Sequence, residues 1–402
     1  MTRIMVVGAG IAGTAAALGL HRAGFEVTVH EAHPDTGADI GAFLTLASNG
    51  MRALAQLDAA APVAGLGFPL TSMSVLDEAG QQLAEVPLGE PDHPLTRYRC
   101  LRRAELGAVL REEVGRRGIP VRHSARLVGL TEDADGVTAR FADGGSATAD
   151  LLVGADGLHS AVRAQLDPAA PRPGYAGQRV FYGCTTEAAP PGGPSDRITM
   201  VRGSGAAFGY AVSPAGETFW FARVPGPAVT EDELAGGSPV RWREQLLPLL
   251  RPDRTPTAEI VAATSERLMV TNALHLGPGV RWRGRRTVLI GDAAHAASPA
   301  TGQGASMALE DAVLLAKALR DRGPGPAALE RYEELRRPRT ERNIAVSAQL
   351  TAARTAERSP AAPPARDTER PPARVDEELL RLLDWDTPLP DSDPEPEPDP
   401  VA

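Results

Sequence analysis

The chain has 402 residues, of which 43% are hydrophobic and 23% charged, so it can bury a large core in about two or three domains. The formal net charge is −9 and no basic stripe is present, which argues against a nucleic acid partner. The two cysteines exclude a disulfide framework, and no apolar run reaches the ~18 residues of a membrane span, so we expect a soluble cytoplasmic protein.

The N-terminal segment predicts a strand, a helix and a second strand. Residues 3–7 form an apolar run of strand length, and residues 11–23 are rich in Ala and Leu at helical spacing. Residues 25–30 then alternate as a second strand. A β-α-β unit of this kind is typical of the start of a dinucleotide-binding fold.

The turn between the first strand and the helix carries a glycine motif. Gly8, Gly10 and Gly13 have the spacing G-x-G-x-x-G. The first glycine permits a tight turn, the second lets a diphosphate approach the backbone, and the third lets the helix pack on the strand. Glu31 ends the second strand, where an acid can bind the ribose hydroxyls of a dinucleotide. For the glycines alone, a turn without a ligand stays open as the alternative.

The middle of the chain changes character twice. An amphipathic helix is predicted at 103–117, and strands at 121–123, 137–141 and 151–153. Residues 178–223 then form short alternating runs separated by Gly, Pro and Ser. This pattern predicts an antiparallel sheet inserted into the parallel domain.

Two further strand-turn-helix junctions carry acids. In residues 150–163 a buried strand precedes a Gly-Ala-Asp-Gly turn that contains Asp156. In residues 287–311 an apolar strand is followed by Asp292, by a Gly-Gln-Gly turn and by a long helix from about residue 302 to 320. Ligands bind at the carboxyl ends of strands in open α/β sheets, but both acids can equally be helix caps.

In chain order, these three motifs resemble those of the para-hydroxybenzoate-hydroxylase-like flavoprotein monooxygenases. The resemblance extends from residue 1 to about residue 345. It implies an α/β fold in which a Rossmann-like, parallel FAD-binding domain carries an inserted, mostly antiparallel substrate domain and C-terminal helices. The expected FAD-binding segments are 1–70, 101–170 and 276–350, the substrate segments are 71–100 and 171–275, and residues 351–402 are a Pro-rich acidic tail.

Most of this tail is expected to be disordered, because its Pro-rich, polar composition cannot form a packed core. One amphipathic stretch, 377–385, is predicted to form a turn or two of helix that docks on the body.

The resemblance also implies which residues hold FAD. They are Gly8, Gly10, Ile11, Ala12, Gly13, Glu31, Ala32, Arg103, Asp156, Gly291, Asp292, Pro299, Gly302, Gln303, Gly304 and Ala305. In that family Arg103 corresponds to an arginine that reaches the cofactor, Asp156 to a residue between FAD and the nicotinamide path, and Asp292 to a ligand of the ribityl chain. The turn at 299–304 corresponds to the segment against the flavin ring. Ala32 departs from the family, which often has a basic residue there.

The resembled reaction uses FAD as cofactor and NADPH or NADH as a transient co-substrate. Reduced flavin and O₂ give a flavin C4a-hydroperoxide, which hydroxylates or epoxidises an aromatic or polycyclic substrate in a site that excludes water. No second glycine motif offers the nicotinamide a domain of its own, and the histidines suggest no metal site. We expect a natural-product-like small molecule as substrate, and a monomer or homodimer.

Residues on the substrate side are harder to identify from sequence. Segment 41–49 resembles the family segment between flavin and substrate, so Leu44, Thr45 and Leu46 are candidate substrate contacts. In the inserted sheet we expect a substrate surface formed by Phe208, Tyr210, Phe219 and Phe221. Tyr210 is the candidate for binding or activating a phenol. Ordinary sheet core is the alternative for each of these aromatic residues.

Several other functions share this scaffold. A flavin halogenase needs a lysine between flavin and substrate, but the single lysine of this chain, Lys317, lies inside the predicted long helix and no Trp-x-Trp segment is present. A dehydrogenase without oxygen insertion, a Baeyer–Villiger oxygenase and a non-catalytic flavin-binding protein stay open.

Overall fold

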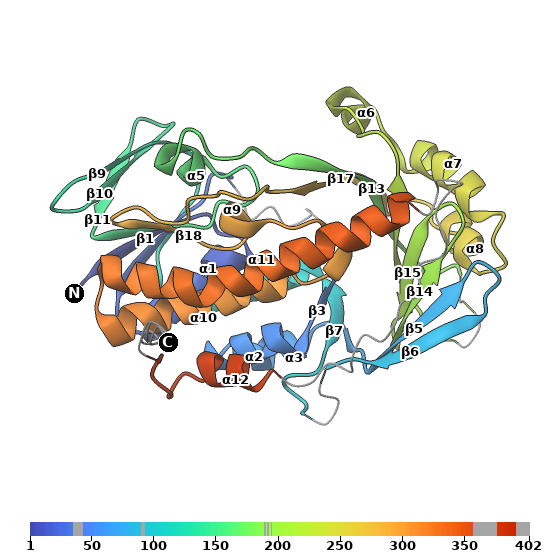
Figure 1. Ribbon diagram of the computed structural model, residues 1–402, viewed down its shortest axis with the longest axis horizontal. Coiled ribbons are helices and arrows are strands. Elements are labelled where there is room, and N and C mark those ends of the chain that lie inside the picture. The colour runs from blue at the N-terminus through green and yellow to red at the C-terminus, as the bar shows by residue number, and fades with distance from the viewer. Residues whose placement is uncertain are drawn as a thin grey trace, which may run out of the picture.

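The computed structural model describes residues 1–34, 43–89, 93–188, 190, 193, 195–356 and 376–390 (Figure 1). Residues 41 and 42 of the predicted flavin segment, and residues 357–375 and 391–402 of the predicted tail, lie outside the described residues.

A five-stranded parallel sheet forms the centre of the larger half of the molecule. Its strands follow the order β18-β12-β1-β2-β8, and each neighbouring pair is parallel. They are β1 (Arg3–Val7), β2 (Glu26–His30), β8 (Val121–Arg122), β12 (Leu151–Gly154) and β18 (Thr287–Leu289). Most residues of these strands are apolar and buried, because both faces of the sheet are covered.

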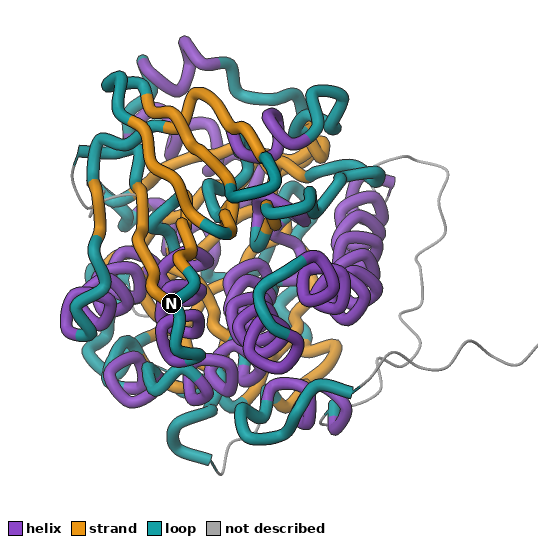
Figure 2. Tube along the Cα trace, turned by 90° about the vertical axis from the view of Figure 1, so that its left-hand side faces the viewer, coloured by secondary structure: helices purple, strands orange, loops and turns teal. Residues whose placement is uncertain are grey.

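Helices pack around this sheet, and their apolar side chains join one main core. Figure 2 shows, at a right angle to the first view, that helices cover one face of the strands near the N-terminus. The helices are α1 (Ile11–Arg22), α2 (Ser48–Gln56), α3 (Ala60–Ala64), α4 (Arg103–Arg116), α5 (Ala161–Leu166), α9 (Asp292–His295) and α10 (Gly304–Arg322), with the short 3₁₀ turn η1 (Pro299–Thr301). None of the helices in the described part of the chain is long and apolar enough to cross a membrane.

Two small sheets flank the parallel one. The hairpin sheet has the order β11-β10-β9, and the junction sheet has the order β3-β7-β4. Their strands are β3 (Phe43–Leu46), β4 (Phe68–Pro69), β7 (Arg99–Arg102), β9 (Leu127–Glu132), β10 (Val137–Phe141) and β11 (Ser146–Ala149). The sequence patterns of 121–123, 137–141 and 151–153 predicted single strands, and did not show that 137–141 belongs to a separate sheet.

A seven-stranded sheet forms the other half, in the order β17-β13-β16-β15-β14-β5-β6. The strands are β5 (Ser72–Asp77), β6 (Gln82–Pro87), β13 (Gly174–Thr185), β14 (Arg197–Arg202), β15 (Ala207–Val212), β16 (Thr218–Pro225) and β17 (Leu268–His275). The pairing is antiparallel except between β14 and β5, which are parallel. The predicted, mostly antiparallel insertion is therefore confirmed.

The two faces of this sheet have different surroundings. Phe208, Tyr210 and Trp220 lie on the outer face, in a core with residues of α7 (Pro239–Leu250) and α8 (Thr257–Ala262); α6 (Glu231–Ala235) precedes these helices. Phe219 and Phe221 lie on the opposite, inner face, which packs against β3, β4 and β7. The inner face therefore looks toward the parallel-sheet half of the molecule.

Two C-terminal helices complete the fold. The helix α11 (Pro326–Ala356) runs the length of the molecule and ends against β13, and α12 (Glu377–Leu383) lies beside α2 and α10 (Figure 1). The helix predicted within 377–385 is confirmed. Its Leu379 and Leu383 are buried in the main core.

Candidate active site

A cavity of about 540 Å³ lies at the carboxyl ends of β1 and β2, where the glycine turn meets the N-terminus of α1. Gly8 has φ 104°, in the region that favours glycine. A Cβ on Gly13 would stand 1.9 Å from the carbonyl oxygen of Gly8, so a side chain there would break the turn. A Cβ on Gly10 would meet no described atom within 4 Å, which leaves open space at the helix N-terminus. This is the shape that a diphosphate requires.

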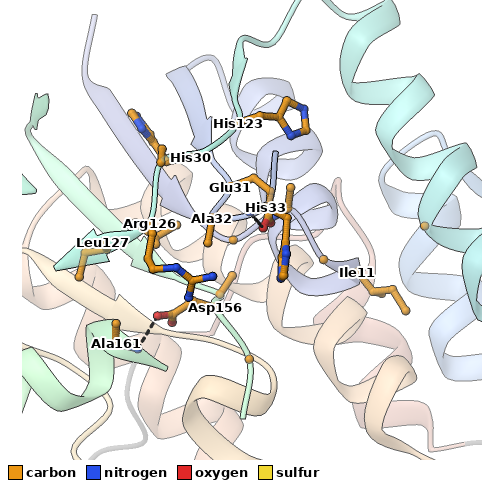
Figure 3. Close-up of a pocket in the computed structure, with 18 of the residues that line it drawn as sticks. Ile11, His30, Glu31, Ala32, His33, His123, Arg126, Leu127, Asp156 and Ala161 are labelled. Atoms are coloured by element: carbon orange, nitrogen blue, oxygen red, sulfur yellow. Dashed lines mark hydrogen bonds between the residues drawn. The ribbon is translucent and has the colours of Figure 1, made fainter. Parts of the chain in front are cut away.

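Glu31 holds this turn in place. Its two carboxylate oxygens accept hydrogen bonds from the backbone N–H of Ala9 (2.7 Å) and of His33 (2.8 Å). A carboxylate offers about four acceptor positions, so two stay available for ribose hydroxyls. Figure 3 shows Glu31 and Ala32 at the wall of the cavity.

Asp156 is above all a cap of α5. Its carboxylate accepts hydrogen bonds from the Ser160 hydroxyl (2.5 Å) and from the backbone N–H of Ala161 (2.7 Å) and Val162 (3.0 Å). Burial raises the pKa of Asp156, and these hydrogen bonds oppose the rise. The cap alternative is thus what the structure shows, although Asp156 also lines the cavity (Figure 3).

Three arginines supply positive charge to the cavity: Arg103 and Arg111 from α4, and Arg126 from the loop before β9. Among the described residues none of the three forms an ion pair or a side-chain hydrogen bond with an acid. Figure 3 shows the Arg126 side chain projecting between Ala32 and Asp156. Uncompensated guanidinium groups suit an anionic ligand such as a diphosphate.

A second group of predicted cofactor residues lies at the end of β18. The Asp292 carboxylate is exposed and makes no hydrogen bond or ion pair with the described residues. The preceding Gly291 has φ 58°, and a Cβ there would stand 2.9 Å from Cβ of Ala12 on α1. The glycine turn and the Asp292 turn are therefore neighbours, and one extended ligand can contact both.

The turn from Pro299 to the start of α10 faces β3. Pro299, Gly302 and Gly304 are exposed, and a Cβ on Gly302 would lie 3.4 Å from the Thr45 hydroxyl. The Ser306 hydroxyl accepts a hydrogen bond from the backbone N–H of Ala47 (3.2 Å). The exposed N-terminus of α10 favours negative charge on whatever lies in front of it.

A buried ion network supports these turns from below. Arg336 is fully buried and pairs with Glu310 (2.6 Å) and Asp311 (2.7 Å). Asp311 also accepts hydrogen bonds from the backbone N–H of Gly291 (2.8 Å) and from His295 Nε2 (2.6 Å). Burial acts against the charge of Asp311, but His295 and Arg336 hold its pKa well below the usual value. His295 is thus a structural residue.

The comparisons with known proteins decide the family. Residues 1–347 match the family described as "FAD binding domain". The chain belongs to the FAD-dependent monooxygenases. It is similar to an aurachin C monooxygenase/isomerase of Stigmatella aurantiaca, with 32% identity over 83% of this chain and 84% of the relative. It is 35% identical to the 3-amino-4-hydroxybenzoate 2-monooxygenase PtmB3 of Streptomyces platensis, over 84% of both chains.

The fold matches as well. A crystal structure of Klebsiella pneumoniae HpxO with FAD and uric acid superposes with a TM-score of 0.78 at 30% identity, over 88% of each chain. The resemblance to the single-component flavoprotein monooxygenases and the α/β fold are therefore confirmed, and FAD is the cofactor. The residues present fit FAD, because the open space at Gly10 and the free Asp292 carboxylate belong to neighbouring turns.

The aromatic residues of the seven-stranded sheet lie on its two opposite faces and not on one. The register pairs Tyr210 with Trp220, and Ala211 with Phe219, so Phe208 and Tyr210 point away from Phe219 and Phe221. Phe208 and Tyr210 are buried under α7 and α8, which corrects the expectation that the four aromatic residues form one surface and places Tyr210 on the face away from β3. Leu46 is likewise fully buried in the main core, whereas Leu44 and Thr45 are half-buried.

The sequence patterns did not identify two further residues of the inner face. Tyr182 lies directly opposite Phe221, and Arg223 is buried further along the same strand as Phe221. Burial raises the pKa of Tyr182, and the positive charges of Arg223 and Arg103 oppose the rise. The alternation within β13 and within β16 shows which residues of each strand share a face. Only the register between the two strands shows that Tyr182 and Phe221 lie side by side.

Proposed function

We propose that this monooxygenase uses NADPH or NADH and O₂ to hydroxylate or epoxidise an aromatic or polycyclic, natural-product-like substrate. The observation that carries the proposal is the aromatic inner face beside β3. Phe43 of β3 lies 5.6 Å from Phe219 and 6.2 Å from Phe221, measured between ring centroids. The names of the relatives support the same substrate class, since they include enzymes of aurachin C and of 3-amino-4-hydroxybenzoate.

The proposed position of FAD follows the glycine turn and the Asp292 turn. Its diphosphate would rest on the N-terminus of α1 near Gly10 and Arg103, with its ribose at Glu31. Its ribityl chain would contact Asp292, and its ring would lie near Thr45 and the turn at residues 302–304. Bound FAD would accept a hydride from the nicotinamide and activate O₂.

The substrate would lie between this ring position and the inner face. Phe221, half-buried Met200 and the segment of Leu44 and Thr45 would exclude water, as oxygen transfer requires. The hydroxyl of Tyr182 would orient a polar group of the substrate. Arg103 and the exposed groove beside Asp156 are the proposed approach for the nicotinamide. A cytoplasmic location and a monomeric or homodimeric state complete the proposal.

The test is a substrate panel with ¹⁸O-labelled dioxygen. Polycyclic and simple aromatic compounds are incubated with the holoenzyme and with NADPH or NADH, and the products are analysed by mass. We expect an active compound to stimulate NAD(P)H consumption and to gain one labelled oxygen atom.

The other outcomes point to other functions. An oxidised but unlabelled product, formed without consumption of NAD(P)H, would indicate a dehydrogenase. A lactone or ester product would indicate Baeyer–Villiger insertion. Stimulation by small, highly charged acids alone would contradict the proposed substrate class, because the aromatic inner face offers them little apolar contact.

A further inference from the structure

The C-terminal segment 376–390, here called the C-terminal clamp, lies beyond the residues that match the family. It contains α12 and follows the end of α11 in the sequence, yet it packs beside α2 and α10 (Figure 1). These two helices begin next to the proposed position of the flavin ring, α2 after β3 and α10 after the Gly-Gln-Gly turn.

Apolar and aromatic contacts fix the clamp to the body. Four of its side chains are buried in the main core: Leu379, Leu383, Trp385 and Leu389. The Trp385 ring contacts two guanidinium groups, those of Arg22 (4.5 Å from the ring centroid) and Arg320 (4.9 Å). Such cation–π contacts add to the hydrophobic burial of the ring.

Polar contacts fix the backbone of the clamp. The buried amine of Lys317 on α10 donates to the carbonyls of Leu382 (2.6 Å) and Asp384 at the end of α12. A cation at a helix C-terminus satisfies carbonyls that have no partner within the helix. The backbone N–H of Trp385 donates to Gln56 Oε1 at the end of α2 (2.9 Å). The clamp therefore binds α10 and α2 to each other.

A chain of side chains leads from the clamp to the flavin turn. Asp376 pairs with Arg339 (2.9 Å), and Arg339 donates to Glu310 (2.9 Å). Glu310 accepts a hydrogen bond from Asn49 Nδ2 (2.6 Å) on α2, and the same group lies 3.1 Å from Gln303 Oε1 in the turn. Each link joins groups of opposite charge or complementary polarity.

We propose that the C-terminal clamp positions the flavin-binding turn by holding α2 against α10, so that clamp docking and FAD binding strengthen each other. Asp376 and Trp385 are its positioning residues. They act through Arg339 and Glu310, and through Gln56, and they do not touch the reacting atoms. The inference rests on the proposed place of the flavin ring beside residues 299–304.

The first test compares two substitutions of equal charge change on the full-length holoenzyme. Asp376→Asn removes the charge that faces Arg339 but keeps a good N-cap for α12. Glu378→Gln is the matched control, because Glu378 is exposed on the same helix and makes no ion pair with the described residues. Trp385→Ala removes the aromatic anchor. The rate of FAD release, the visible spectrum of the bound flavin and the melting temperature are measured for each.

We expect FAD release to be about two- to threefold faster in the Asp376 variant, since the pair is partly exposed. We expect it to be about tenfold faster in the Trp385 variant, with weaker shoulders on the flavin absorption band. The Glu378 variant should match the wild type. If the rate of FAD release from both D376N and W385A equals that of the wild type within error, the proposal is overturned. If W385A does not fold, an Asp376 variant equal to the Glu378 control overturns it alone.

The second test uses Lys317, the single lysine of the chain, as a reporter of clamp opening. An amine-reactive ester acylates its Nζ only when the clamp is undocked, and the α-amine of Met1 serves as the internal reference. Because coupling between two equilibria is reciprocal, FAD should lower the undocked fraction of the clamp, and with it Lys317 acylation, by about the factor by which the docked clamp lowers the dissociation constant of FAD. Equal acylation with and without FAD would contradict the coupling. Failure of the wild type to bind FAD would instead refute the proposed cofactor placement.

Discussion

The three glycines of the nucleotide turn have different neighbours. We therefore expect some of them to matter for folding and others for binding. Gly8 and Gly13 face backbone atoms of the protein, whereas Gly10 faces open space. The G-x-G-x-x-G spacing predicted the tight turn at Gly8 and the close packing at Gly13 correctly, and the diphosphate at Gly10 stays a prediction. The sequence could not predict that the Asp156 carboxylate accepts its hydrogen bonds from the start of α5. An aspartate that caps a helix and an aspartate that binds a ligand both occur at a strand-turn-helix junction.

Gly10→Ala should leave the apoprotein folded with an unchanged melting temperature, but weaken FAD binding by at least about tenfold. Its new methyl group would occupy the space of the diphosphate. Gly13→Ala should cost about 3 kcal/mol or more of unfolding free energy, because its Cβ would collide with the Gly8 carbonyl. Flavin titration and thermal melts of both variants check this. Normal FAD affinity in the Gly10 variant would contradict the proposed diphosphate position.

Two acids near the proposed flavin ring, Asp292 and Asp311, should affect different properties of the protein. Asp292→Asn should weaken FAD binding without lowering stability, since the carboxylate is exposed and has no partner among the described residues. Asp311→Asn should destabilise the fold by about 3–5 kcal/mol, because it leaves buried Arg336 with one acid fewer. Chemical unfolding and FAD titration measure the two effects. A stable, flavin-loaded Asp311 variant would show that the network is dispensable.

His30 should make the protein sensitive to acid. Its ring stacks on Phe141 at 4.7 Å, and burial, followed by the charge of Arg122, lowers its pKa from 6.5 to about 4. Between these values the unfolded chain binds a proton that the folded chain does not, so stability falls as the pH drops from 6.5 to 4, by at most about 3 kcal/mol. His30→Phe should reduce this loss in urea melts across that range. An unchanged pH slope would assign the sensitivity to other groups.

At the scale of elements, the alternation of apolar and polar residues predicted the strands of the inserted sheet, but not what covers each face of that sheet. The strand β15 lies within the alternating runs predicted at 178–223. Two facts decide on which face each aromatic side chain lies: the register that puts Tyr210 opposite Trp220, and the later helices α7 and α8 that cover the outer face. Neither is encoded within β15 or β16, so the sequence did not show that Phe208 and Tyr210 lie on the face opposite Phe219 and Phe221.

Phe208→Ala and Phe221→Ala test this assignment of faces. Phe208 is fully buried against Trp220, so its loss should cost about 3–5 kcal/mol of stability. Phe221 is half-buried on the inner face, so its loss should cost less stability but increase NAD(P)H oxidation that yields no oxygenated product. Unfolding curves and the ratio of product to oxidised nicotinamide measure both. Equal effects of the two substitutions would contradict the assignment.

At the scale of the whole molecule, distant segments converge on one groove. The sequence predicted the parallel domain, the inserted sheet and the docking of a short helix within 377–385, because each depends on local patterns. It did not predict the network of Glu310, Asp311 and Arg336, whose members belong to two helices that pack only in the tertiary structure. Ion pairs between separate helices leave no spacing that a sequence can show.

The most direct measurement is a crystal structure of the protein with FAD. The account predicts electron density for the diphosphate at the N-terminus of α1 beside Gly10, and for the flavin ring between Thr45 and residues 302–304. Density for the ring at another place, or a groove closed by side chains in crystals soaked with FAD, would contradict it.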